Sequence, residues 1–307
     1  MCFLKPFDLM FDLSKKINQI FVLVFLALIW GSSFILMKKG LRSYTPIEIT
    51  LYRILIVFIV FLPFCINKLK KVTKRDFFII SITGIVGSAI PYFLFIKAQT
   101  FIDSSLNGIL NSITPLFTIL FGTVFFSQKF NLKTIAGVII GLFGAVGLIV
   151  VANNNINTNA LLYSFLPLIG SACYALNLNI IKLYLNHISA LLITGISFLI
   201  IGPVSSYFLM AKTDFIVHLL QNDTNYLNFI YINVLGIIGT GLAVWIFNLL
   251  IKETSSVFAS SVTYLIPIVA IVWGVVDGEN FIFIEGLFCG VIFTGVYLIR
   301  QPSSKTN

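Results

Sequence analysis

The segment SSLNGILNSITPLFTILFGTVFF, residues 104–126, contains the pattern that decides the fold. It holds no charged side chain, and roughly 20 predominantly apolar residues are enough for a helix to cross about 30 Å of membrane hydrocarbon. Its small and polar residues recur every three or four positions, so a helix carries them on one face. The segment is therefore predicted to be a transmembrane helix with one polar face.

Nine further segments meet the same test of length and apolarity. Strands would leave backbone groups unpaired in lipid unless a barrel closed, and the alternating polarity of a barrel is absent. The sequence predicts an all-α integral membrane protein with ten transmembrane helices at approximately 18–37, 47–66, 77–97, 104–126, 133–152, 160–181, 189–210, 227–250, 256–276 and 281–299.

The composition excludes a soluble globular domain, because 58% of the 307 residues are hydrophobic, only 10% are charged and the mean hydropathy is +1.02. The net charge of +9 comes from basic residues scattered through short loops, so no nucleic-acid partner is expected. The four cysteines are widely separated, and the sequence has no metal-ligand cluster, phosphate-binding loop or paired catalytic acids. We therefore expect no metal, no cofactor and no enzymatic activity.

An internal repeat is the most informative feature of the sequence. A shift of 152 residues pairs six Gly, Pro, Phe and Ser positions without a gap: Gly84 with Gly236, Gly87 with Gly239, Phe95 with Phe247, Ser104 with Ser256, Pro115 with Pro267 and Gly122 with Gly274. Each half holds five spans, an odd number, so the second half must cross the membrane in the opposite sense. The sequence predicts two inverted five-helix repeats, with a substrate site near the midplane between them.

The predicted domain boundaries follow from this repeat. They are an N-terminal cytoplasmic segment at 1–17, the first repeat at 18–152, the second repeat at 160–299 and a cytoplasmic tail at 300–307.

The loop charges predict the orientation in the membrane. With the amino terminus inside, 14 basic residues fall on the inner side and 5 on the outer side, and Arg53 is left within the second span. The outer set is Lys38, Lys39, Arg42, Lys97 and Lys212. Both termini are therefore expected to be cytoplasmic.

Polar residues within the spans are the candidate substrate ligands. On the fourth span, Asn107 and Asn111 share a face with Pro115. Close packing of helices explains the Gly, Ala and Ser of such a face, whereas two amides in hydrocarbon favour a hydrated cavity. The candidate substrate-binding residues are Trp30, Ser33, Tyr92, Asn107, Asn111, Pro115, Tyr174, Asn177, Trp245, Asn248, Thr263, Tyr264 and Pro267. For Tyr92 and Trp245, a role in the core or as interfacial anchors is an equal alternative.

Charged residues are expected at the ends of the spans. Arg53 lies about 9 Å along the second helix, close enough to the outer interface for its side chain to reach it, so we expect a role in orientation or packing. Glu279 and Asp103 fall at span ends. The expected cavity is therefore uncharged, which favours a neutral or zwitterionic solute over a polyanion.

Several motifs together resemble a known family. They are Trp30-Gly31-Ser32-Ser33 in the first span, Pro46 with Arg53 in the second, Asp103-Ser104-Ser105 before Pro115 in the fourth, and Ser255-Ser256 before Pro267 with Glu279 beyond. The chain resembles the drug/metabolite transporter superfamily, in its ten-helix EamA type, over nearly all of residues 18–299. This resemblance implies export of amino acids, other metabolites or drugs. In one departure from repeat symmetry, Ser127 stands where the second half has Glu279.

We expect a secondary transporter, and an exporter in particular, that moves a small neutral or zwitterionic metabolite such as an amino acid across the inner (plasma) membrane by alternating access. A flippase of the same fold for lipid-linked or amphipathic substrates is the alternative, and a membrane enzyme is less favoured. The expected partners are the small-molecule substrate and the lipid bilayer, with a homodimer left open.

Overall fold

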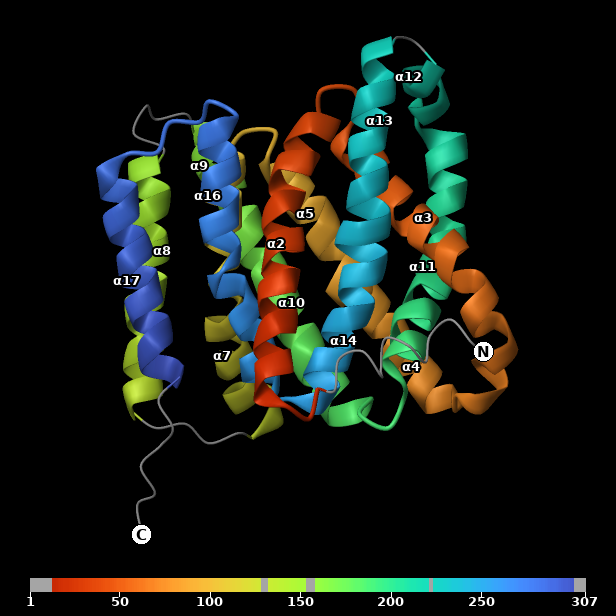
Figure 1. Cartoon of the computed structure of the whole chain (residues 1–307), viewed down its shortest axis with the longest axis horizontal. Coiled ribbons are helices and arrows are strands. Elements are labelled where there is room, and N and C mark those ends of the chain that lie inside the picture. Colours follow the sequence, from red (N-terminus) through yellow and green to blue (C-terminus); the bar gives the residue numbers. More distant parts are fainter. Residues whose placement is uncertain (1–12, 128–131, 153–157, 221–222, 301–307) are drawn as a thin grey trace.

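The computed structural model describes residues 13–127, 132–152, 158–220 and 223–300, and in these residues the regular structure is helical throughout. Most of the predicted N-terminal segment, the centre of the loop between the two halves and nearly all of the predicted tail lie outside the described residues. Figure 1 shows the helices side by side and mostly upright, with α2 (Lys16–Gly40) beginning and α17 (Phe283–Arg300) ending at the same edge of the molecule.

Eight stretches of the described residues are long and apolar enough to cross a membrane. They are Lys16–Gly40, Pro46–Leu69, Lys74–Ala98, Ser104–Phe126, Asn159–Tyr184, Ala190–Lys212, Tyr226–Glu253 and Ser256–Val276. Two further apolar helices, α8 (Leu132–Ala152) and α17, occupy the predicted fifth and tenth spans. The prediction of an all-α integral membrane protein is confirmed.

The first half of the chain is built from α2, then α3 (Pro46–Cys65) with the 3₁₀ helix η1 (Ile66–Lys71), then α4 (Lys74–Gly84), η2 (Ile85–Ala89) and α5 (Ile90–Ala98), then α6 (Ser104–Asn111) and α7 (Thr114–Phe126), and finally α8. The second half consists of α9 (Thr158–Tyr163), α10 (Phe165–Tyr184), α11 (Ala190–Lys212), α12 (Phe215–Leu220), α13 (Asp223–Gly236), η3 (Ile237–Leu242), α14 (Ala243–Glu253), α15 (Ser256–Ser260), η4 (Ser261–Tyr264), α16 (Ile266–Val276) and α17.

Several spans that we expected to be continuous helices are interrupted, and the interruptions recur. The π-helical turns η2 and η3 begin 152 residues apart, at Ile85 and Ile237. The fourth span breaks at Ser112 and Ile113, and the ninth span breaks near Leu265, again 152 residues from Ile113. Prolines at the first turns of α7 and α16 explain these breaks, because a proline ring is disfavoured within a continuing helix. π-Turns and broken helices are common at functional sites.

The second span begins at a capping box formed by Thr45 and Glu48. The backbone N–H of Thr45 donates to the carboxylate of Glu48 at 2.7 Å, and the Thr45 hydroxyl accepts from the backbone N–H of Glu48 at 3.4 Å. Pro46 occupies the first turn, where no intrahelical donor is needed. The sequence thus sets where α3 starts.

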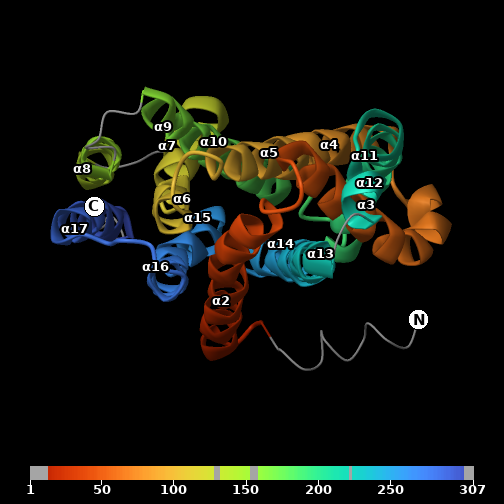
Figure 2. The ribbon, with the colours of Figure 1, turned by 90° about the horizontal axis from the view of Figure 1, so that it is seen from above.

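The helices pack into two groups. Two clusters of buried apolar side chains hold the fold together, a larger one joining α2, α3, α11 and α14 and a smaller one joining α6, α7, α8 and α17. Figure 2 shows α8 and α17 as a pair at one end of the molecule, with α3 and α11 near the other. Large apolar side chains such as Phe78, Phe125 and Phe143 are exposed on the outside, as expected for surfaces that face lipid.

Candidate functional site

A cavity lies between the spans of the two halves. It contains about 830 Å³ of space free of protein atoms, a figure that includes space open to the outside. Its lining is drawn from α2, α3, α5, α7, α10 and α14 and from the interrupted regions beside them: Trp30, Ser33, Phe34, Met37, Arg53, Gly87, Tyr92, Phe95, Asn111, Thr114, Tyr174, Asn177, Leu178, Val244, Phe247, Asn248, Ser260 and Thr263.

Eight of the thirteen predicted site residues line this cavity. They are Trp30, Ser33, Tyr92, Asn111, Tyr174, Asn177, Asn248 and Thr263. Neighbouring lining residues lie on the same helix faces, since Phe34 and Met37 follow Trp30 at helical spacing, as Phe247 follows Val244. This periodicity is the sequence signal from which the aromatic part of the lining could have been predicted.

The other five predicted residues are outside the lining. Asn107 is fully buried and donates its amide to the backbone oxygen of Phe95 at 2.8 Å, behind the cavity wall. Pro115 and Pro267 lie in the first turns of α7 and α16, where they shape the helix breaks. Trp245 and Tyr264 instead pack with the larger and the smaller apolar cluster, respectively.

The polar stripe of the fourth span therefore serves mostly for packing. A Cβ added at Gly108 would lie 2.5 Å from the Cβ of Ala270, so the glycine allows α6 and α16 to approach closely. The backbone oxygen of Thr118 accepts a hydrogen bond from Asn179 of α10. Asn111 at the end of α6 does line the cavity, as does Thr114 at the start of α7.

The position expected for Arg53 was wrong, and so was the expectation of an uncharged cavity. Its side chain is only 5% exposed and lines the cavity instead of reaching the outer interface. Nε donates to the hydroxyl of Thr240 at 3.0 Å, and Cζ lies 4.1 Å from the centroid of the Tyr92 ring. The sequence position of Arg53 gives its distance from the start of the second helix. That distance does not reveal that the cavity extends this far toward the start of the helix.

Aromatic rings form much of the remaining wall. Trp30 and Phe247 meet edge to face at 4.8 Å, and Phe95 stacks on Tyr174 at 5.7 Å. The indole N–H of Trp30 donates to the backbone oxygen of Gly239 at 3.0 Å, which fixes the ring against the second half of the chain. The cavity can therefore hold the apolar part of a small solute.

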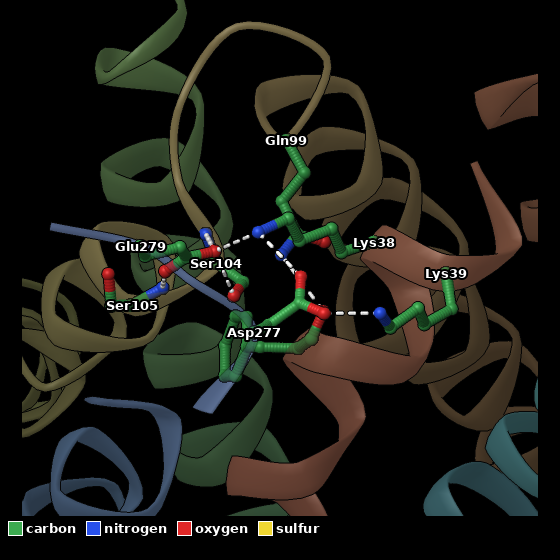
Figure 3. Close-up of polar contacts among 8 residues, drawn as sticks. Lys38, Lys39, Gln99, Ser104, Ser105, Asp277 and Glu279 are labelled. Carbon is green, nitrogen blue, oxygen red and sulfur yellow. Dashed lines mark hydrogen bonds and ion pairs between the residues drawn. The ribbon is translucent and has the colours of Figure 1, made fainter. Parts of the chain in front are cut away.

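An ion-pair cluster joins the two halves at one end of the helices (Figure 3). It consists of Lys38, Lys39, Ser104 and Ser105 from the first half and Asp277 and Glu279 from the second. Lys38 lies 2.9 Å from the Asp277 carboxylate and 2.8 Å from that of Glu279, and Lys39 also pairs with Asp277.

Glu279 is the centre of this cluster. Its Oε1 accepts from the backbone N–H and the hydroxyl of Ser104 at 3.0 and 2.6 Å, and its Oε2 accepts from the backbone N–H of Ser105 at 3.0 Å. The carboxylate thus caps the start of α6, where free N–H groups favour negative charge. Burial alone would raise the pKa of Glu279, but the hydrogen bonds from Lys38, Ser104 and Ser105 outweigh it and lower this pKa to about 2.

A glycine makes this contact possible. A Cβ added at Gly274 would lie 2.4 Å from Oε2 of Glu279 and 3.1 Å from the Cβ of Ser105. The backbone N–H of Glu279 also donates to the Gly274 oxygen at 2.9 Å, which closes the turn after α16. Sequence reasoning placed Glu279 at a span end, as the structure does, but did not predict its partners on the other half.

Comparison with known proteins supplies the family. The sequence profile of the EamA-like transporter family matches residues 18–150 and 161–301. The chain belongs to the EamA-like transporter family. It is 26% identical, over 89% of its own length and 88% of the relative's, to a protein described as uncharacterized inner membrane transporter YedA in Escherichia coli strain K12, and equally to those of strains CFT073 and O157:H7.

The fold is shared with a solved protein as well. One crystal structure, titled only as that of a protein, superposes with a TM-score of 0.65 at 14% identity, over 93% of this chain and 98% of the other. Membership of the EamA-like family makes the chain a multi-pass membrane transporter rather than an enzyme, and implies a small-molecule substrate.

Proposed function

We propose that this EamA-like transporter is a secondary transporter that exports a small neutral or zwitterionic metabolite, such as an amino acid, across the inner membrane by alternating access. The observation that carries the proposal is a cavity between the two halves with an ion-pair cluster that joins those halves at one end. A contact of this kind closes one side while it is formed and opens that side when it breaks.

The recurrence of irregular helices supports an inverted-repeat mechanism. The π-turns η2 and η3 and the breaks near Ile113 and Leu265 follow the same spacing of 152 residues as the matched Gly and Pro positions. Helices interrupted at equivalent positions of two repeats are typical of transporters that rock one repeat against the other around a central site. The proposed repeats are residues 18–152 and 160–299.

The loop charges support an outer location for the closed end. Lys38 and Lys39 belong to the smaller, outer set of basic residues, and the ion-pair cluster contains both. A resting state closed on the outside takes up its solute from the cytoplasm, which suits an exporter. Both termini are then cytoplasmic.

The test is the accessibility of the cavity from each side of the membrane. We would replace the native cysteines, introduce Ser33→Cys on the cavity wall and label it with an impermeant maleimide in right-side-out and inside-out vesicles. Labelling in inside-out vesicles, and much slower labelling in right-side-out vesicles, is expected. Equal labelling from both sides in the resting protein would argue against alternating access.

The rival function within the same fold is a flippase. Its signature is movement of fluorescent lipid between the leaflets of proteoliposomes, without exchange of water-soluble solutes. We expect solute exchange and no lipid movement above that of protein-free vesicles.

A further inference from the structure

The cavity contains a buried cation, Arg53, that has no anionic partner among the described residues. Five N–H groups are available on Arg53, and the hydrogen bonds formed are those of Nε to Thr240 at 3.0 Å and of Nη1 to the sulfur of Met37 at 3.8 Å. The Tyr92 ring below the guanidinium adds a cation–π contact. These groups carry no negative charge.

The acidic side chains near the buried parts of the structure have partners elsewhere. In the described residues, Glu48 contacts His218, and Asp76 contacts His187. Asp277 and Glu279 pair with Lys38. None of the ion pairs among the described residues involves Arg53. An isolated charge is costly to remove from water. The positive charge of Arg53 is therefore neutralised only when an anion enters the cavity.

We propose that Arg53 binds a carboxylate group of the transported solute. The inference rests on the proposed transport function and redefines its substrate class as solutes with a single carboxylate group, which are zwitterionic amino acids and small monocarboxylate anions. A guanidinium matches the two oxygens of a carboxylate in a bidentate pair. Among the described residues that line the cavity there is no second Arg and no Lys, so this lining can neutralise one negative charge and disfavours a polyanion.

The rest of the lining suits the remainder of such a solute. Trp30, Phe34 and Phe247 offer apolar and aromatic faces. The buried amide oxygen of Asn177 has no hydrogen-bond partner of acceptable geometry among the described residues, and it is free to accept from an ammonium or hydroxyl group. An amphipathic monocarboxylate therefore satisfies the charge, the apolar wall and the free acceptor together.

The test compares each amino acid with its amide, which lacks the carboxylate, and with the corresponding acid that lacks the amino group. Full-length protein in lipid nanodiscs would be titrated with L-leucine, L-leucinamide and 4-methylpentanoate, and with L-phenylalanine, L-phenylalaninamide and 3-phenylpropionate, while the thermal unfolding midpoint is recorded. A bound solute raises this midpoint in proportion to the logarithm of its concentration over its dissociation constant. At least one acid is expected to stabilise the protein, and its amide is expected not to.

Two substitutions separate binding from folding. Arg53→Gln removes a buried unpaired charge, so the empty protein should stay folded, and its affinity for the stabilising acid should fall at least thirtyfold, which is about 2 kcal/mol. Arg53→Lys keeps the charge without the planar fork and should lose about tenfold. The matched control is Arg42→Gln in the exposed loop after α2, which should leave the affinity unchanged.

The inference fails if the amides stabilise the wild-type protein as well as the acids do, if none of the acids stabilises it, or if Arg53→Gln keeps the preference for acids. Failure of the transport proposal would be seen in a different experiment, as equal labelling of Ser33→Cys from the two sides of the membrane. Asymmetric labelling together with equal binding of acids and amides would support the transport function and contradict the proposed role of Arg53.

Discussion

Single residues set the shape of the cavity wall. A Cβ added at Gly87 would lie 2.3 Å from the side-chain amide of Asn177, so the absence of a side chain in η2 lets this amide of α10 lie against the first half. The spacing of Gly84 and Gly87, which recurs at Gly236 and Gly239, is typical of close helix packing. The glycine spacing indicates that packing, but no pattern in the sequence indicates that its partner is a cavity residue.

Gly87→Ala should keep the fold but weaken solute binding. The obstructing atoms are the far end of a flexible side chain, which can move aside, and the displaced amide would then narrow the cavity. We expect about a tenfold loss in affinity, corresponding to about 1.4 kcal/mol, measured by thermal shift. The control is Gly290→Ala in α17, where nothing lies within 4 Å, and which should bind normally. Normal binding by Gly87→Ala would contradict this role.

Asn111→Leu should weaken binding through loss of a polar group on the lining. Removing such a group typically costs about 1 to 3 kcal/mol, so affinity and transport should fall roughly ten- to a hundredfold with membrane insertion unchanged. Thr123→Val on α7 is the control, because it also removes a polar group but at an exposed position outside the cavity lining. Equal effects of the two substitutions would show that Asn111 is not part of the binding site.

At the scale of helices, the ends were more predictable than the interruptions. Thr45, Pro46 and Glu48 form the capping box because capping depends on a few neighbouring side chains. The π-turns have no comparable set of neighbouring side chains that marks them in the sequence, and π-turns are rare. The position of Arg53 was mispredicted for a similar reason, because the depth of a side chain depends on what surrounds the helix.

Glu279→Gln should shift the protein toward the state that is open on the outer side. The substitution removes the charge that pairs with Lys38 and caps α6, while Ser127 at the equivalent position of the first half offers no matching acid at the other end. Labelling of Ser33→Cys in right-side-out vesicles should rise at least fivefold. Glu285→Gln, six residues further on and outside the cluster, should leave labelling unchanged. No change with Glu279→Gln would show that the cluster does not close the cavity.

Closure of the outer side should be insensitive to pH in the physiological range. Hydrogen bonds lower the pKa of Glu279 to about 2 from an ordinary value of 4.5, and the paired lysines lower the pKa of Asp277. A lowered pKa stabilises the closed contact fully above the ordinary value and loses this contribution as the pH falls toward 2. Labelling of Ser33→Cys, corrected for the reactivity of the thiol, should be constant from pH 6 to 8. A titration within this range would point to another group.

At the scale of the whole molecule, composition and hydropathy were sufficient to predict the membrane fold. Ten apolar segments of spanning length require a lipid bilayer, because water would not solvate them. The cavity was only partly predictable. Eight of the predicted site residues line the cavity. The contacts between Glu279 and α6 join residues about 175 positions apart, and their pairing follows from packing of the two halves.

The topology makes a separate prediction. Thr100 lies in the loop between α5 and α6, and Lys74 begins α4, and both are exposed. Cysteines introduced at the two positions should differ in labelling by an impermeant maleimide on intact cells stripped of their outer wall. Thr100→Cys should label and Lys74→Cys should not. The reverse pattern would place the ion-pair cluster on the cytoplasmic side and favour import.

The most direct test of the central claim joins the ion-pair cluster to flux. Ser104→Cys and Glu279→Cys, in protein without its native cysteines, would be linked by a cleavable bifunctional maleimide, and exchange of the best-bound acid of the panel would be measured in preloaded proteoliposomes. Linking the two halves should stop exchange, and cleaving the linker should restore it, because the halves must separate at this end to release the solute. Exchange that continues at the same rate with the linker in place would contradict alternating access through this cavity.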